Sequence, residues 1–588
     1  MLVESTMQPA GTVTGRTAGE VTMRRLSIAI AALSLLISAC AQQPPGGGAA
    51  TSAPTGTAAA AAPMRGGTFI FAMWQEPTTL APLYVNQTIA GLVGQIVYEG
   101  LADTDNDGNY VPRLAKSIPT VGNGKVRVSG TKMEVEWELQ SGVKWSDGTP
   151  LTSADIVFTW QTWMKDPKVV NRAGFSEIET IDTPNDTTAI VKYKSIYAPY
   201  FLNFGGLMPK HLLTGVEDIS KHDYNRKPLG TGPFVVTDFK AGDSITVERN
   251  PNYRVKDKPY LDKIIFKSVP TSEVAIAQLK AGEVHGMWNL LESQTVDLDK
   301  DTNLKILVTP SPSVERIELN TAVNKDMTDP TSAHPVLGDI AMRKALLWAT
   351  PKQQLIDKLL FGKAKPGSSP VSQGWAAYKE PQDGYDPAKA NAELDKAGWV
   401  KGSDGIRSKG GARASLTITS TTGNQTRERV EQVLIDEYKQ IGVELKIQNQ
   451  PSAVFLSGSW AASDPRKRGT FDLAMYASSP GIDPHVTVST RYHSKQIPSA
   501  ANNGIGQNYT RFKDPEADKA IDEAGATLDL EKRKAAYAKA LRLLNQAYVI
   551  IWLYDRANID AHRTSVGGWQ SNVWDEVTWN AEDWSLKK

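Results

Sequence analysis

The sequence predicts an α/β fold, because segments with the two-residue period of a strand alternate with segments that have the period of a helix. Residues 133–140 alternate apolar with mostly acidic side chains, the pattern of a half-buried strand. Residues 416–418, 426–441 and 443–447 follow the patterns of strand, helix and strand, and such a βαβ unit favours parallel pairing. At 588 residues, the chain is long enough for about two to four domains.

Start signals place four further helices. Thr152, followed three residues later by Asp155, opens a helix with a capping box. The Asp-Pro pair at 386–387 caps a second helix. Two helical stretches follow the Asp-Pro pair at 514–515. The second of them leads into residues 549–554, an apolar run that predicts a buried strand.

Charge and cysteine content exclude several classes of protein. The chain has 65 Lys and Arg against 64 Asp and Glu, a formal net charge of +1. Nucleic-acid binding needs a basic surface, and so does electrostatic attachment to anionic lipid, so we expect neither. The single cysteine excludes an internal disulfide and a zinc site built from cysteine pairs. The core must therefore form by apolar burial.

The N-terminal region explains the single cysteine. Met23 and two arginines precede an apolar run at 26–39, which fits a signal peptide and is too short to span a membrane. Cys40 directly follows small residues, as in the bacterial lipobox, so we expect Cys40 to be the lipid attachment site. We expect residues 1–39 to be the signal peptide, with Met23 as the start that gives a standard length. Residues 40–65 carry the lipidated cysteine and an Ala-, Gly- and Pro-rich tether.

A series of short motifs resembles one bacterial family. The motifs are Gly-Gly-Thr-Phe at 66–69, Glu-Pro-Thr-Thr-Leu at 76–80, Val-Tyr-Glu-Gly-Leu at 97–101, Pro-Arg-Leu-Ala-Lys-Ser at 112–117, Gly-Val-Lys-Trp-Ser-Asp-Gly-Thr-Pro-Leu at 142–151, Gly-Thr-Gly-Pro-Phe at 230–234, Arg-Asn-Pro-Asn-Tyr at 249–253 and Tyr-Asp-Pro at 385–387. In this order they are similar to the bacterial extracellular solute-binding proteins of family 5, the peptide- and oligopeptide-binding lipoproteins of ABC importers. The resemblance covers roughly residues 66–555, and the ordered series is more specific than any single motif.

The resemblance implies a two-lobed periplasmic-binding-protein-like fold of the large, dipeptide- and oligopeptide-binding type, with an inserted subdomain. Two crossing segments would form the hinge between the lobes, and we place them near residues 314–320 and 549–554. The boundaries that follow are residues 66–97, 225–315 and 545–588 for a discontinuous lobe I, 98–224 for the inserted subdomain, and 316–544 for lobe II.

The resemblance also implies a function outside the cytoplasm, at the outer face of the cytoplasmic membrane. The protein would capture a peptide or a related small solute between two closing lobes and deliver it to the permease subunits of an ABC importer. We expect a monomer with a lipid anchor, no cofactor, no metal and no enzymatic activity. Three alternatives stay open: binding of an oligosaccharide or another solute in the same fold, a signalling lipoprotein without transport, and a secreted hydrolase.

Three regions bind ligand in the family: the first strand with its loop, the loop before Tyr-Asp-Pro, and a loop in the second lobe. In typical peptide binders an Asp in the third region pairs with the free α-amino group of the peptide, and that position here is Gly481. Asp483 fits either a structural turn or an anchoring role, and Trp74 and Trp375 fit either ligand contact or packing. The candidate ligand-binding residues are Trp74, Glu76, Thr79, Asn320, Trp375, Tyr378, Tyr476, Ser478, Ser479, Gly481 and Asp483.

Two motifs that suggest other chemistry are better explained as hairpin turns. Residues 103–108 match the opening of a calcium-binding loop, but the position that should close the coordination holds Leu114 instead of Glu. Residues 242–244 suggest a hydrolase nucleophile but join two alternating strands. The seven histidines are scattered and no HExxH occurs, so the sequence predicts no metal site and no catalytic residue.

Overall fold

The computed structural model describes residues 63–84, 87–169, 172, 174–323, 332–458, 464–502 and 504–587. Residues 62–588 form one compact unit. The predicted signal peptide, Cys40 and residues 40–62 of the predicted tether lie outside the described residues. Within the described ranges, no helix is both long enough and apolar enough to cross a bilayer.

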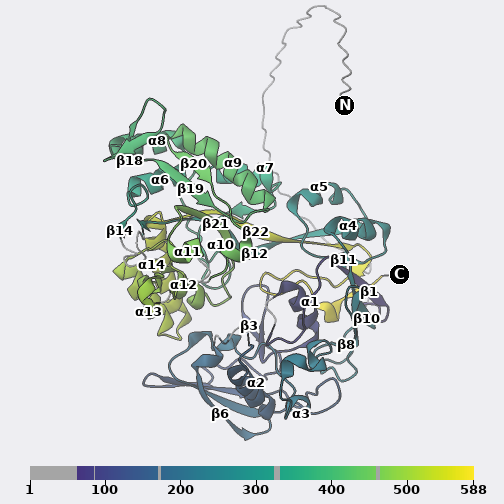
Figure 1. The fold of residues 1–588 in the computed structure, drawn as a ribbon. Helices are drawn as coiled ribbons and strands as arrows, with labels where there is room; N and C mark the ends of the chain where they lie inside the picture. Colours follow the sequence, from purple (N-terminus) through teal and green to yellow (C-terminus); the bar gives the residue numbers. More distant parts are fainter. Residues whose placement is uncertain are drawn as a thin grey trace, which may run out of the picture. The chain divides into compact units, whose positions relative to one another are not determined.

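An 11-stranded mixed sheet runs through this unit (Figure 1). The strand order is β20-β19-β21-β12-β22-β11-β1-β10-β9-β8, and β15 pairs with β22 off this path. The strands are β1 (Thr68–Met73), β8 (Phe234–Lys240), β9 (Ser244–Arg249), β10 (Lys263–Ser268), β11 (Gly286–Met287), β12 (Leu304–Leu319), β15 (Lys365–Pro366), β19 (Ser415–Thr419), β20 (Glu444–Ile447), β21 (Leu473–Ser478) and β22 (Ile550–Arg563).

The long strands β12 and β22 join two groups of strands. Near its C-terminal end β22 pairs with β11, whereas the last six residues of β12 pair with β21. Between these contacts the β12–β22 ladder is interrupted, because Pro310 pairs with Ala557 and the next pair is Val314 with Asp555. Extra residues in one strand bend and twist the ladder at this point. The interruption lies directly beside both predicted hinge segments, and both strands continue beyond those segments.

Four helices surround the parallel strands at one end of the sheet. They are α6 (Ile340–Trp348), α7 (Lys352–Leu359), α8 (Pro387–Lys396) and α9 (Gln425–Gln440). α9 connects β19 to β20, which pair in parallel, so the predicted βαβ unit is confirmed. Val430, Leu434 and Tyr438 of α9 are buried in one apolar cluster with α6, α7 and α8. The carboxylate of Asp386 accepts a hydrogen bond from the Lys389 backbone N–H at 2.8 Å and caps α8 as expected.

Three more helices form a second buried cluster against the opposite face of β22, because this cluster contains Ile550 and Trp552 whereas the first contains Ile551 and Leu553. They are α12 (His485–Tyr492), α13 (Pro515–Gly525) and α14 (Leu530–Gln546), so both helices predicted after residues 514–515 are confirmed. Val488, Ile521 and Tyr537 pack together with Trp552 of β22. Leu528, in the turn between α13 and α14, packs against the core of residues 98–224.

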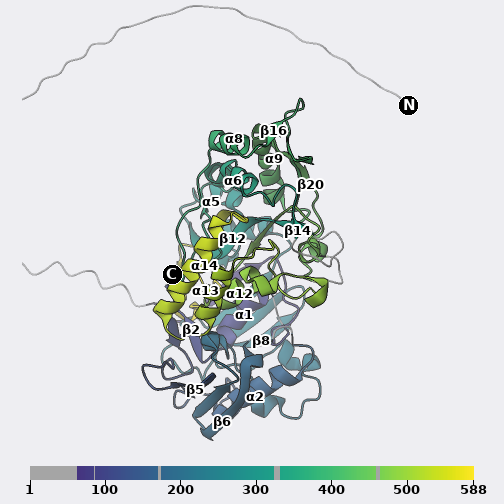
Figure 2. The same cartoon turned by 90° about the vertical axis from the view of Figure 1, so that its left-hand side faces the viewer.

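Residues 98–224 contain their own four-stranded sheet. Its order is β4-β5-β7-β6, with β4 (Val126–Ser129), β5 (Lys132–Glu138), β6 (Ile178–Asn185) and β7 (Thr188–Tyr193), and α2 (Ser153–Lys165) contacts it (Figure 2). Met133, Val135 and Trp137 of β5 are buried, as their alternation predicts. The Thr152 N–H donates to the Asp155 carboxylate at 2.9 Å, and α2 begins there.

Shorter elements complete the unit. Both motifs assigned to hairpin turns lie in hairpins, β2–β3 and β8–β9. The remaining helices and strands are α1 (Thr88–Val97), β2 (Ala102–Thr104), β3 (Tyr110–Pro112), α3 (Lys210–Leu213), α4 (Ser272–Ala281), α5 (Thr295–Leu298), β13 (Ala322–Val323), β14 (Ser332–Ala333), β16 (Val400–Lys401), β17 (Arg407–Lys409), β18 (Ala412–Arg413), α10 (Ser452–Phe455), α11 (Pro465–Arg468), β23 (Val566–Gly567) and β24 (Ser585–Leu586).

The C-terminal segment packs on the first strand. The indole rings of Trp569 and Trp584 stack with centroids 4.3 Å apart, and both contact Phe69 and Phe71 of β1. All four side chains are buried in one apolar cluster. These two tryptophans therefore belong to the core and are not free to stack on a sugar.

Gly230 shows why the motif at residues 230–234 begins with glycine. A Cβ on Gly230 would lie 1.9 Å from the carbonyl oxygen of Val97, at the end of α1. The Gly230 carbonyl accepts from the Ser146 N–H at 2.9 Å, and the Gly232 N–H donates to the Val97 carbonyl at 2.9 Å. The backbones of three distant segments therefore meet where no side chain fits.

We expect Gly230→Ala to destabilise the folded protein by about 3 kcal/mol, because the added methyl group forces these backbones apart. Exposed Gly384, where a Cβ would meet nothing within 4 Å, supplies the control. Gly384→Ala should change stability by no more than about 0.5 kcal/mol. Calorimetric melting of the two variants and the wild type measures the effect, and equal melting temperatures would contradict this account.

Candidate functional site

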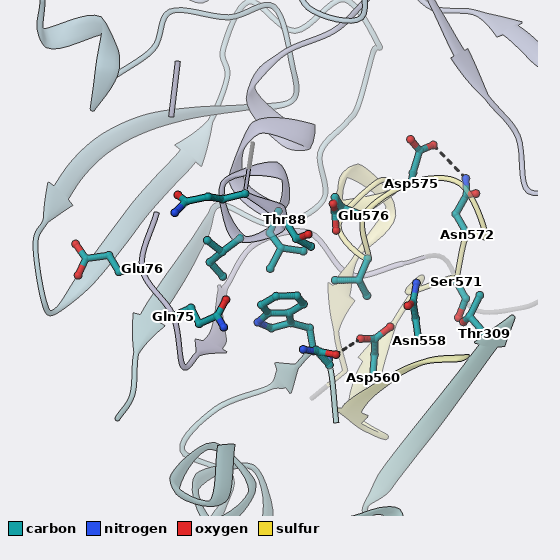
Figure 3. A pocket seen from close by; sticks show the side chains of 16 residues that line it. Gln75, Glu76, Thr88, Thr309, Asn558, Asp560, Ser571, Asn572, Asp575 and Glu576 are labelled. Carbon is teal, nitrogen blue, oxygen red and sulfur yellow. Dashed lines mark hydrogen bonds between the residues drawn. The ribbon is translucent and has the colours of Figure 1, made fainter. Parts of the chain in front are cut away.

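A cavity of about 690 Å³ lies beside the centre of the large sheet (Figure 3). Its walls come from the loop after β1, the N-terminal end of α1, the segment after β11, the strands β12 and β22, and residues 571–577. This volume falls in the range of about 300–1,000 Å³ that small-molecule sites occupy. The lining residues are Gln75, Glu76, Gln87, Thr88, Ile89, Leu92, Trp288, Asn289, Thr309, Asn558, Asp560, Ser571, Asn572, Asp575, Glu576 and Val577.

We call it the acidic cavity, because four of these residues are carboxylic acids and none is Lys, Arg or His. Figure 3 shows Glu576 and Asp560 on one side and Glu76 on the opposite side. Burial raises the pKa of Asp560 to about 7. Burial and then the charge of Asp560 raise the pKa of Glu576 to about 7 as well. The cavity therefore holds two carboxyl groups where solvent is scarce and their ionised form is disfavoured.

Residues 571–577 are held in place by the β2–β3 hairpin. The Val573 N–H donates to Asn106 Oδ1 at 3.1 Å, and Asn572 Nδ2 donates to the Thr104 carbonyl at 3.4 Å. Asn572 Nδ2 also donates to Asp575 at 3.3 Å (Figure 3). Burial and then the charge of Asp103, at the base of the hairpin, raise the pKa of Asp575. The hairpin thus positions one wall of the acidic cavity.

The loop at residues 372–378 meets this hairpin, and we call the meeting point the hairpin–loop contact. A Cβ on Gly108 would lie 3.2 Å from Trp574 Nε1 and 3.3 Å from the Cα of Gly374. Gly108 and Gly374 have φ angles of +87° and +77°, which glycine adopts without strain. Two glycines and one indole ring therefore bring the loop that precedes α8 against the inserted region.

Trp375 and Asp483 belong to one buried group of side chains. Both oxygens of Asp483 accept hydrogen bonds from the Arg533 guanidinium, at 2.6 and 2.8 Å, and both residues are 3% exposed. The guanidinium carbon lies 5.0 Å from the Trp375 ring centroid. Burial and then the charge of Asp483 raise the pKa of Tyr110 in β3. The structure thus brings two predicted residues from different loops together, and Tyr110 lies near them.

The predicted residues on and near β21 form a separate group. The Tyr476 ring is buried between the guanidinium carbons of Arg316 and Arg466, at 4.2 and 4.8 Å from the ring centroid. Arg316 also donates to Ser478 Oγ at 2.5 Å. Among the remaining predictions, Asn320 is 1% exposed and donates to two backbone carbonyls, whereas Ser479 and Gly481 are exposed.

The residues predicted in and after β1 divide between the cavity and local structure. Glu76 lines the acidic cavity, and its carboxylate accepts from the Gly242 N–H at 2.8 Å. Trp74 stacks on the lining residue Trp288, with centroids 5.8 Å apart and planes at 14°. Thr79 hydrogen-bonds Asn225, and in the other half of the chain the Tyr378 hydroxyl donates to Glu380 at 2.7 Å.

Sequence reasoning missed most of the cavity lining. Trp288, Thr309, Asn558, Asp560 and Glu576 come from segments to which no ligand contact was assigned. One signal was present, because polar Asn558 and Asp560 alternate with apolar residues directly after the predicted strand at 549–554. Extending the predicted strand from residue 554 to residue 561 places Asn558 and Asp560 on one face of β22.

We expect Asp483→Asn to destabilise the ligand-free protein by about 3 to 5 kcal/mol, because the change leaves the buried charge of Arg533 without its partner. Glu516→Gln, which breaks the exposed ion pair with Lys539, is the matched control and should leave the melting temperature unchanged. The measurement is calorimetric melting after bound ligand has been removed by unfolding and refolding. If Asp483 served only as a ligand anchor, its replacement would abolish binding and leave this melting temperature unaltered.

Comparison with known proteins places this geometry in a family. Residues 109–499 match the family described as bacterial extracellular solute-binding proteins, family 5 Middle. The oligopeptide-binding protein AppA of Bacillus subtilis is 26% identical over 539 residues, which cover 90% of this chain and 93% of that protein. Protein XP55 of Streptomyces lividans is 29% identical, and the match covers 81% of each chain. The structure of Bacillus subtilis AppA in complex with a nonapeptide aligns with a TM-score of 0.67 at 27% identity, covering 90% of this chain and 100% of that one.

The matched region exceeds half of the chain, and the aligned structure confirms the two-lobed α/β fold that the motifs imply. The family consists of binding proteins rather than enzymes. The chain is thus a member of the bacterial extracellular solute-binding proteins of family 5.

Proposed function

We propose that the protein captures peptides at the acidic cavity and the hairpin–loop contact, and delivers them to the permease of an ABC importer. Relatives named as oligopeptide-binding proteins support this ligand class, and one of them was solved with a nonapeptide bound. The observation that carries the proposal is that four of the buried donors without a hydrogen-bond partner among the described residues lie around the site. They are Trp74 Nε1, Trp288 Nε1, Trp375 Nε1 and Tyr110 Oη.

Unpartnered donors fit a peptide backbone. A buried N–H or O–H without an acceptor costs roughly 1–3 kcal/mol, so such groups are conspicuous in a native protein. A peptide offers a carbonyl acceptor at every residue, whatever its side chains are. Donors from β1, from the segment after β11 and from the opposite loop would therefore each gain a partner when a peptide is bound.

The same contacts would also draw the two lobes together. A ligand shifts a protein toward the closed state only through interactions that are better in that state than in the open one. Trp375 follows β15, which pairs with β22 before the ladder interruption, and Trp288 follows β11, which pairs with β22 after it, so a ligand that engages both stabilises their approach. The permease would then receive the closed form.

An oligosaccharide is the second candidate, and the Trp288 side chain in the cavity wall favours it. An indole face stacks on the apolar face of a sugar ring, and the surrounding Asn and Thr side chains hydrogen-bond hydroxyl groups. In either case we propose binding without chemical change of the ligand, by a monomer.

Mass spectrometry of solutes released from the purified protein by mild denaturation distinguishes the two candidates. We expect peptides in the released fraction. We also expect a peptide mixture at a hundredfold excess over its dissociation constant to stabilise the refolded, ligand-free protein by about 2.7 kcal/mol. A released oligosaccharide, together with no thermal stabilisation by peptides, would contradict peptide capture.

The lipid anchor has its own test. We propose that Cys40 carries the lipid that holds the protein at the outer face of the cytoplasmic membrane. Cys40→Ala should move the protein from the membrane fraction to the soluble fraction while its melting temperature stays the same, because the compact unit begins at residue 62. Fractionation of expressing cells followed by immunodetection measures this, and unaltered membrane association of the variant would refute the anchor.

A further inference from the structure

The acidic cavity contains two carboxylates that have no cationic partner among the described residues. Asp560, on β22, is 6% exposed. Among the described residues, its carboxylate accepts one hydrogen bond, from the Asn289 N–H at 3.1 Å. The Glu576 side chain has neither a hydrogen bond nor an ion pair with a described residue, and one of its oxygens lies 3.0 Å from where a Cβ on Gly91 would be. Two other buried acids have a cationic partner, because Asp483 pairs with Arg533 at 2.6 Å and Glu315 pairs with Arg427 at 2.8 Å.

Two further groups in the same walls lack a partner. The Thr309 hydroxyl and the Trp288 indole N–H are buried, with side chains 5% and 8% exposed, and have no hydrogen bond to any described residue. Both residues line the cavity. Two buried polar groups without a partner therefore face the same space as two carboxylates without a cation, although buried polar groups are normally paired.

The arrangement fits an organic cation better than a metal ion. Among the described residues, no three His, Cys, Asp or Glu side chains converge as metal ligands would. An ammonium or guanidinium needs only one or two carboxylates and one or two neutral acceptors, and an indole face favours a cation above it. Asp560 and Glu576 supply the carboxylates, Thr309 supplies the neutral acceptor, and Trp288 supplies the indole.

We propose that the acidic cavity is a subsite for a cationic group of the captured solute, an ammonium or a guanidinium bound between Asp560 and Glu576. This inference rests on the proposed function, because the cation belongs to the ligand that the two lobes enclose. For a peptide ligand, the subsite selects sequences that carry Lys or Arg. Burial raises the pKa of both carboxyls because no cation lies close enough to offset it, and a bound ammonium or guanidinium would favour their ionised form.

The test compares peptide pairs that are identical except that Lys is replaced by Nε-acetyllysine. Purified ligand-free protein is incubated with an equimolar mixture of such pairs, and mass spectrometry measures the bound fraction. We expect the wild type to retain the Lys forms at least about tenfold over their acetylated partners, the equivalent of one charge-assisted hydrogen bond. Asp560→Asn/Glu576→Gln should bring this ratio close to one, whereas Glu283→Gln, at an exposed position before β11, should leave it unchanged.

A second probe separates this inference from peptide binding itself. n-Butylguanidinium carries the cation without a peptide, and n-butylurea is its neutral counterpart. We expect only n-butylguanidinium to raise the melting temperature of the wild type, and neither compound to affect the double variant. If peptides are retained without preference for Lys, the subsite is refuted and peptide capture stands. If no peptide is retained but n-butylguanidinium binds in a way that needs Asp560 and Glu576, peptide capture fails and the cation subsite stands. If neither probe binds, the subsite is refuted.

Discussion

The antiparallel pairing of β12 with β22 is the constraint on which the rest of the structure depends. β12 and β22 connect two groups of strands in the large sheet, β19 to β21 on one side and β1 with β8 to β11 on the other. The chain runs from one group to the other along β12 and returns along β22. The chain must therefore build both groups from segments far apart in sequence. We propose that the hinge lies where the ladder is interrupted between Pro310 and Val314, because rotation there would leave the strand pairs on both sides intact.

The same strands explain how ligand contacts are coupled to the relative position of the lobes. Thr309, Asn558 and Asp560 line the acidic cavity on one side of the interruption, and Glu315 and Arg316 are buried on the other side. The ion pair between Glu315 and Arg427 fixes the second half of β12 to α9. We therefore expect this half of β12 to move together with α9 and the helices packed around it. A ligand bound in the cavity, as proposed, would contact residues a few positions from the bend, where a small rotation would change the approach of the loop at residues 372–378.

Local patterns predicted the elements well because each depends on neighbouring residues. The βαβ unit, the Thr152–Asp155 cap and both hairpin turns are determined by spacing within a few residues, and all were confirmed. The candidate site depends instead on contacts between residues hundreds of positions apart. No local signal places Asn106 beside Val573 or Gly108 beside Gly374, because these contacts exist only after the sheet has formed.

The family resemblance helped at the level of the fold and less at the level of the site. It pointed to the loops that hold Trp375 and Asp483, which the structure does bring together. It did not point to Asp560 or Glu576, because their proposed role depends on the absence of a nearby cation among the described residues. An unpaired charge can be recognised only when the whole surroundings are known. Trp569 and Trp584 are a second example of contacts that the sequence does not reveal. Nothing in their position near the C-terminus indicates that they pack against β1.

Small-angle X-ray scattering tests the central claim most directly. The refolded, ligand-free protein is measured alone and again after the solutes released by denaturation have been added back. The account predicts that the radius of gyration falls when ligand binds, because the two lobes approach each other by bending at β12 and β22. An unchanged radius of gyration in a sample whose bound ligand is verified by mass spectrometry would contradict it.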